Sequence, residues 1–146
     1  MKKLICLPIL TGFLLVAISS TTFAQDTEKE KNPIDIRLDN CLNADSNYAN
    51  INLVKCEIKA LEEWDAELNK TYKEFKDALD PSLQENLRDA QRKWVTYKES
   101  ETQFMDAMYE KMEGTMWQIV IVDRQKEVIR QRAIELKNYY DTWQYK

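Results

Sequence analysis

The sequence predicts an all-α fold: an antiparallel three-helix bundle with a short N-terminal helix tied to it by a disulfide. Apolar residues alternate at spacings of three and four over long stretches, which is the helical period. Proline and glycine stand between these stretches, where helices end and begin. Two cysteines, Cys41 and Cys56, flank the first connection. Short connections between long helices imply antiparallel neighbours.

The first 24 residues have the three-part pattern of a secretory signal. Lys2 and Lys3 precede an apolar run over residues 4–18, and small residues follow up to Ala24. We expect cleavage after Ala24, where the small-residue stretch ends. A membrane anchor is not expected, because the apolar run is shorter than the roughly 20 residues that a membrane span needs. The pattern predicts a periplasmic or secreted protein with no membrane span after signal cleavage.

Residues 25–32 are expected to be a flexible tether, because they are charged or polar and have nothing apolar to bury. The helical domain is expected over residues 33–146. The pair Asn32-Pro33 supplies an N-cap and a proline at the first helical position, so a short helix over about 33–43 should follow. The polar run from 43 to 50 then indicates a loop.

A long amphipathic helix is predicted from about Leu53 to Leu79, where the apolar stripe continues for seven turns. It ends at Asp80. The third helix then starts either with Asp80 as the cap and Pro81 at the first position, or with Ser82 and Glu85 as a capping box. Its expected core stripe consists of Leu83, Leu87, Ala90, Trp94, Tyr97, Phe104, Met108 and Met112.

The third helix is expected to end near Gly114, since glycine suits a helix C-terminus. Thr115 and Gln118 offer a capping box for the last helix. The β-branched run 119–122 could instead favour a strand, but no other segment offers a partner strand, so a helix is expected. Its stripe consists of Ile119, Val122, Ile129, Ala133, Leu136, Tyr140 and Trp143.

Composition disfavours most enzyme classes. The chain has no histidine, the usual general base and a common zinc ligand, and one glycine remains after the signal, too few for a phosphate-binding loop. Carboxylates are plentiful, but their spacing selects no glycosidase pair. We therefore expect no enzyme activity, no cofactor and no metal site.

Charge and cysteine count indicate the kind of partner and the compartment. Without the expected signal the chain keeps 19 basic and 25 acidic residues, a formal charge of −6. That balance disfavours nucleic acid and favours a basic protein. Cys6 lies in the expected signal, so two cysteines remain after cleavage. Cys41 and Cys56 predict a disulfide, because an even cysteine count in an exported chain rarely means free thiols. A metal site would lack further ligands.

The polar candidates lie on the second helix, beside its apolar stripe. Asp65 and Asn69 are four residues apart and Tyr72 is three further, so they share one edge. Aspartate and asparagine lower helix propensity, so the pair should have a partner. We interpret these residues as a satisfied polar network that fixes helix register, rather than as a binding or catalytic site. Donors across the bundle could be Gln91, Arg92, Arg124 or Arg132.

Four aromatic residues lie near the end of the chain: Tyr139, Tyr140, Trp143 and Tyr145. Exposed tyrosine and tryptophan would suit a recognition patch. The preferred interpretation is that they continue the core stripe beyond Leu136.

Taken together, the motifs resemble the LprI-type lysozyme-inhibitor domain family, formerly a domain of unknown function. The resemblance covers about Pro33 to Leu136. No catalytic residues come with it, and the family's second cysteine pair is missing near Thr102 and near 122–124. The motifs are Cys41, Cys56, Trp64-Asp65-x-Glu67-Leu68-Asn69-x-x-Tyr72, Ala90-Gln91-Arg92-x-Trp94-x-x-Tyr97, Gly114-Thr115 and Arg132-x-x-x-Leu136.

The resemblance implies a small exported helical domain, in a family named for a member that inhibits lysozyme. The leading hypothesis is a binding protein that inhibits a basic, lysozyme-type muramidase by occupying its cleft. The alternative is an interaction or structural module of the envelope that binds another protein or a wall component without inhibiting it.

Overall fold

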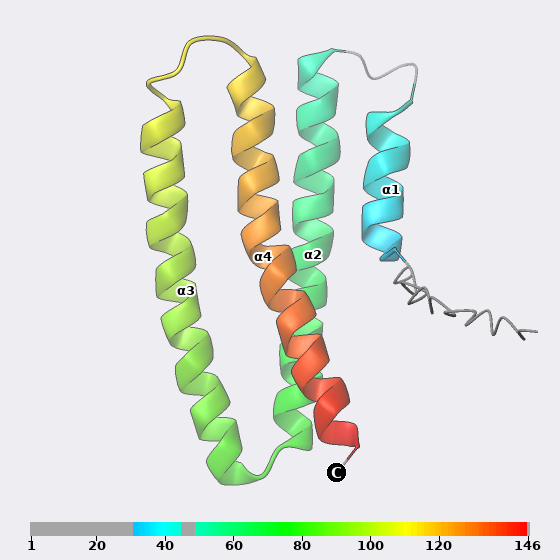
Figure 1. The fold of residues 1–146 in the computed structure, drawn as a ribbon, viewed down its shortest axis with the longest axis vertical. Coiled ribbons are helices and arrows are strands. Elements are labelled where there is room, and N and C mark those ends of the chain that lie inside the picture. Colours follow the sequence, from blue (N-terminus) through cyan, green and yellow to red (C-terminus); the bar gives the residue numbers. More distant parts are fainter. Residues whose placement is uncertain (1–30, 45–48, 146) are drawn as a thin grey trace, which may run out of the picture. The chain divides into compact units, whose positions relative to one another are not determined.

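The structure, a computed structural model, describes residues 31–44 and 49–145, and these ranges contain four helices and no strand (Figure 1). The all-α prediction is confirmed, and residues 119–122 are helical. The expected signal peptide and most of the expected tether lie outside the described residues. The helices are α1 (Pro33–Leu42), α2 (Asn50–Ala78), α3 (Pro81–Tyr109) and α4 (Met116–Gln144).

The predicted starts of α1 and α3 are confirmed. Asn32 caps α1, and its side-chain oxygen accepts a hydrogen bond from the Ile34 amide at 2.9 Å. Proline at the first position pre-sets the helical φ angle, which explains why α1 and α3 both begin at proline. Asp80 is the cap residue of α3, so the alternative start at Ser82 is wrong.

The end of α3 and the start of α4 differ from the prediction. α3 ends at Tyr109, and Gly114 lies in the following loop with φ at 103°, a conformation that favours glycine. Thr115 is the cap residue of α4, but its side chain makes no capping bond. Its hydroxyl oxygen instead accepts a hydrogen bond from Asn50 Nδ2 at 2.9 Å, so the expected capping box is wrong.

The hydrophobic core lies where α2 meets α4 and α1, and the α2–α4 interface is the most extensive between helices. Trp64 and Leu136 are almost completely buried, at 1% and 0% exposure. Both belong to stripes that the three-four spacing predicts, so the sequence pattern identified this core. The other core members are Ile34, Leu38, Cys56, Ala60, Leu68, Phe75, Leu79, Leu87, Ile129 and Ala133.

The expected burial of the α3 stripe is confirmed only in part: Leu87 belongs to the core and Trp94 packs against it, but the rest of the stripe is less buried than expected. Leu87 and Met105 are the residues of α3 that are buried, whereas Tyr97 and Phe104 are 53% and 60% exposed. The physical reason is that α3 packs mainly on α4 and barely touches α2. One edge of its apolar stripe therefore remains in solvent. We call this edge, formed by Leu83, Tyr97 and Phe104, the α3 flank.

The Cys41–Cys56 disulfide joins α1 to α2, with 5.8 Å between the two Cα atoms. It closes a loop across a sequence separation of 15 residues. α1 also packs on α2 through Ile34 and Leu38, which belong to the core. The short helix is therefore held both covalently and by apolar contacts.

Replacing both cysteines by serine should lower the free energy of unfolding by about 3 kcal/mol, because a loop of this length then gains entropy in the unfolded chain. Urea titration followed by tryptophan fluorescence measures the change. Dithiothreitol should cause the same loss in the wild-type protein and none in the double variant. A loss below about 1 kcal/mol would show that noncovalent contacts are sufficient to hold α1.

Candidate functional site

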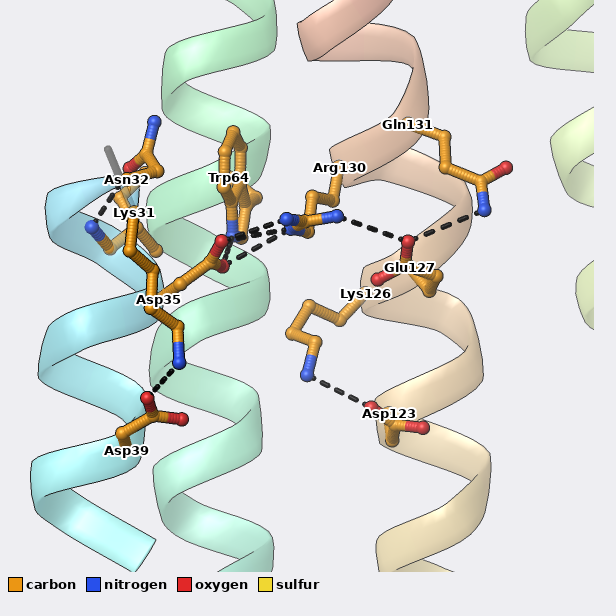
Figure 2. A network of polar contacts seen from close by, with 11 residues as sticks. Lys31, Asn32, Asp35, Asp39, Trp64, Asp123, Lys126, Glu127, Arg130 and Gln131 are labelled. Atoms are coloured by element: carbon orange, nitrogen blue, oxygen red, sulfur yellow. Dashed lines mark hydrogen bonds and ion pairs between the residues drawn. The ribbon is translucent and has the colours of Figure 1, made fainter. Parts of the chain in front are cut away.

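A buried carboxylate, Asp35, joins α1, α2 and α4 (Figure 2). Trp64 donates its indole N–H to Asp35 Oδ1 at 3.1 Å. Arg130 approaches the same carboxylate from α4 and donates from Nη2 to Oδ2 at 2.8 Å and from Nε at 3.1 Å. This paired geometry is the stronger kind of charge-assisted hydrogen bond, so it fixes the register of the three helices.

Arg130 makes two further contacts. Its Nη1 donates to Glu127 at 3.2 Å, and its guanidinium carbon lies 5.4 Å from the centre of the Trp64 ring. The hydrogen bonds that Arg130 donates to Asp35 raise the pKa of Arg130 further above its usual range, against the opposing effect of burial. Among the described residues no buried side-chain nitrogen or oxygen lacks a partner. The network is therefore satisfied, as a structural role requires.

A second buried ion pair links α2 to α4. Lys126 Nζ lies 2.7 Å from Glu57 Oε2, and each side chain is 6% exposed. Asp123, one turn before Lys126, accepts a second bond at 2.9 Å (Figure 2). Burial lowers the pKa of Lys126, but the hydrogen bonds and charges of the two carboxylates outweigh it and raise that pKa. Lys126 is thus held in its charged form.

Sequence reasoning missed these four residues: Asp35, Glu57, Lys126 and Arg130. A signal was present. Lys126 stands four residues after Val122 and three before Ile129, in step with the apolar stripe of its helix. A charge at such a position must be paired or leave the core, and here it is paired.

The polar residues of the α2 motif have their partners within α2, and not on α3 or α4 as expected. Asn69 Nδ2 donates to Asp65 Oδ2 at 3.0 Å, within one helix at the surface. Glu67 lies 3.5 Å from Lys70, again within α2, and Tyr72 is half-buried beside the core. The structure does not bring Asp65 to the donors proposed on α3 and α4. A surface pair of this kind contributes about 0.2–0.5 kcal/mol.

The α3 motif does meet α4. Arg132 Nε donates to Gln91 Oε1 at 3.1 Å, and Arg132 Nη1 forms an ion pair with Glu135. The Trp94 ring lies 6.0 Å from the Arg132 guanidinium and 5.7 Å from Lys98 Nζ. Gln91, Trp94 and Arg132 therefore form a contact between the two helices. Arg92 and Arg124 point to solvent as exposed residues.

An open hollow of about 260 Å³ lies between α3 and α4. Glu135 on its wall accepts a hydrogen bond from the Tyr139 hydroxyl at 3.0 Å, which raises the pKa of Tyr139. Aromatic, amide and charged groups therefore meet at this surface. The lining residues are Trp94, Tyr97, Val128, Gln131, Arg132 and Glu135.

The four aromatic residues near the end of the chain divide into two pairs. Tyr140 packs on Phe75 with ring centres 6.0 Å apart, and the Trp143 indole donates to the Ala78 carbonyl at 3.0 Å. Tyr140 and Trp143 therefore continue the core stripe beyond Leu136, as the preferred interpretation of the sequence expects. Tyr139 and Tyr145 are exposed instead.

In the described part of the chain no three histidine, cysteine, aspartate or glutamate side chains are grouped so that they could hold a metal ion. None of the helices in that part combines the length and apolarity of a membrane span.

Fold and sites define a class: a small, disulfide-tied helical domain whose buried polar groups hold its helices in register. The chain belongs to the LprI family, described as lysozyme inhibitor LprI, whose family model matches residues 41–136. That range includes both cysteines and the motifs on α2, α3 and α4. The expected family membership is confirmed.

Among solved structures, the chain is similar to a crystal structure of an uncharacterized protein from Burkholderia thailandensis. The TM-score is 0.74 at 23% sequence identity, and the match covers 79% of this chain. It covers 57% of the other protein, which therefore has a substantial part with no counterpart in the match. At this identity the likeness shows the fold alone. A comparison with curated proteins finds no match.

Proposed function

We propose that this protein is an exported inhibitor that binds a basic, lysozyme-type muramidase and occludes its substrate cleft. The observation that carries the proposal is the match of the lysozyme-inhibitor family model over residues 41–136. Charge supports it, because an acidic domain is drawn toward a basic enzyme and binds it faster at low salt. The sequence as a whole has a formal charge of −4.

The rigidity of the domain supports the same role. The disulfide, the Asp35–Arg130 pair and the Glu57–Lys126 pair restrain three helices against one another. A binding surface carried on such a frame loses little conformational entropy when it docks. Occlusion needs this binding energy and no catalytic group. We propose export to the periplasm or the medium, on the basis of the signal-like first 24 residues.

The alternative function, an envelope module that binds without inhibiting, has one observation in its favour. The α3 flank exposes Tyr97 and Phe104 beside the hollow that Trp94 lines. Tyrosine and tryptophan are frequent anchors in interfaces. Such a surface would suit a wall component or another protein.

Lysis assays with purified residues 25–146 test the proposal. Several lysozyme types should be tried on cell-wall suspensions and, in parallel, on a short soluble oligosaccharide. We expect dose-dependent inhibition of at least one lysozyme on both substrates, because a blocked cleft excludes both. Binding without inhibition would support the envelope module. Absence of both binding and inhibition at excess protein would reject the inhibitor.

A further inference from the structure

Exposed apolar side chains lie at the end of the domain where a loop joins α3 to α4 (Figure 1 shows the place of this loop). The loop from Glu110 to Thr115 connects α3 to α4 there, and Met112 and Met116 are 40% and 57% exposed. Ile51, in the first turn of α2, is 58% exposed. It follows Asn50, whose side chain bonds to Thr115, so Ile51 lies at the same end. We call residues 110–116 together with Ile51 the tip.

Several contacts hold the tip in shape. The Tyr109 and Trp117 rings on either side of the loop stack with centres 5.5 Å apart. The Trp117 indole donates to the Glu113 carbonyl at 3.0 Å, and the bond from Asn50 to Thr115 ties the loop to α2. The exposed methionines are thus presented by an ordered loop. A preorganised loop loses less conformational entropy when it enters a cleft.

The formal charge of the described residues is concentrated around the tip. Residues 99–122 contain five carboxylates and one basic side chain, Lys111, whereas the remaining described residues contain sixteen of each sign. Glu110 and Glu113 in the loop are exposed. Two of the five carboxylates, Glu110 and Glu113, lie in the tip, and the other three lie further along α3. This end of the domain is therefore negative and would steer a basic partner toward it.

We propose that the tip is the surface that enters the cleft of the basic lysozyme. This inference rests on the proposed inhibitory function and deepens it. Met112, Met116 and Ile51 supply adaptable apolar contact, since methionine fits irregular surfaces. The loop carboxylates pair with cationic groups on the rim of the cleft. Such a division into apolar centre and polar rim is usual in interfaces.

The hollow between α3 and α4 fits this partner less well. Its charged groups are already engaged, because Arg132 pairs with Glu135 and bonds to Gln91. Lys98 stands beside the Trp94 ring, so the surface has no excess of negative charge to attract a basic protein. Charge complementarity therefore favours the tip.

Two variant pairs, each with a matched control, test the tip in the chain from residue 25 to 146. Glu110→Gln/Glu113→Gln is compared with Glu62→Gln/Glu74→Gln, which changes net charge equally at exposed sites on α2. Met112→Ser/Met116→Ser is compared with Ile36→Ser/Ile58→Ser, at isoleucines of α1 and α2 that are 44% and 42% exposed. Circular dichroism and thermal melting verify that each variant is folded. Titration calorimetry and the lysis assay then give affinity and inhibition.

We expect each tip pair to weaken lysozyme binding and inhibition by about tenfold or more, as loss of central interface residues does. The controls should change affinity by about threefold or less, and the charge control should do so mainly through the association rate. If the wild-type protein inhibits lysozyme and both tip variants inhibit it equally well, the tip is not the inhibitory surface, but the inhibitor function stands. If Tyr97→Ser/Phe104→Ser abolishes inhibition and the tip variants do not, the α3 flank is the inhibitory surface in place of the tip. A wild-type protein that binds no lysozyme would overturn both proposals.

Discussion

Replacing Lys126 by alanine is expected to lower the free energy of unfolding by about 3–5 kcal/mol, the usual cost of leaving a buried charge without its partner. Glu57 would remain in the α2–α4 interface with a side chain 6% exposed and its ion partner gone. The total stability of a small domain is only about 5–15 kcal/mol, so the variant should be close to unfolding. Urea titration followed by circular dichroism measures the loss.

Two comparisons separate the buried charge from other causes. Lys137→Ala removes an exposed lysine from the same helix, where it pairs with Asp141, and should cost about 0.5 kcal/mol or less. Glu57→Leu/Lys126→Leu replaces both charges by apolar groups and should recover most of the stability, since such exchanges are often close to neutral. If the double variant is as unstable as Lys126→Ala, the uncompensated charge is not the cause.

Replacing Trp64 by alanine should cost about 3–5 kcal/mol, because it opens a cavity at the centre of the core. Trp64 is 1% exposed, and the guanidinium carbon of Arg130 lies 5.4 Å from the centre of its ring. The change also removes the indole donor from Asp35. Thermal and urea unfolding should both show the loss.

Trp64→Phe separates the two contributions. Phenylalanine keeps most of the apolar volume but cannot donate to Asp35, which still has Arg130 as a partner. We expect a smaller loss of about 1.5–3 kcal/mol, the scale of one hydrogen bond to a charged group. Tyr145→Ala, at a residue that is 92% exposed, should change stability by about 0.5 kcal/mol or less. Equal losses for the two Trp64 variants would assign the whole effect to the hydrogen bond.

The helices and much of the core could be predicted because their signals are local. Asn32-Pro33 starts α1 by a contact between neighbouring residues, and the stripe through Trp64 follows from helical geometry alone. The disulfide was predictable because only Cys41 and Cys56 remain once the expected signal, with Cys6, is set aside, and two cysteines have one pairing. None of these inferences needs to know which helices pack together.

The buried polar network could not be predicted in the same way, because its partners are far apart in the sequence. Asp35 and Arg130 are separated by 95 residues, and Glu57 and Lys126 by 69. Asp65 and Asn69 lie on one edge beside the apolar stripe, which predicted a partner across the bundle, yet they satisfy each other within one turn of helix. Local spacing shows that a polar side chain needs a partner but does not identify it.

The α3 stripe shows a related limit. An apolar face on a helix indicates that burial is favourable, but it does not specify the neighbour or the extent of cover. The pairing of α2 with α4 leaves α3 with one main neighbour, so its outer edge stays exposed. That outcome depends on the packing of the whole domain.

α3 packs mainly on one neighbour, so its sequence can vary more between relatives than those of α2 and α4. Few of its side chains take part in the core, so substitutions along its outer edge should leave folding nearly unchanged. α2 and α4, which share the buried charges, have far less freedom to vary. Relatives can therefore differ along the outer edge of α3 while retaining the same frame of α2 and α4.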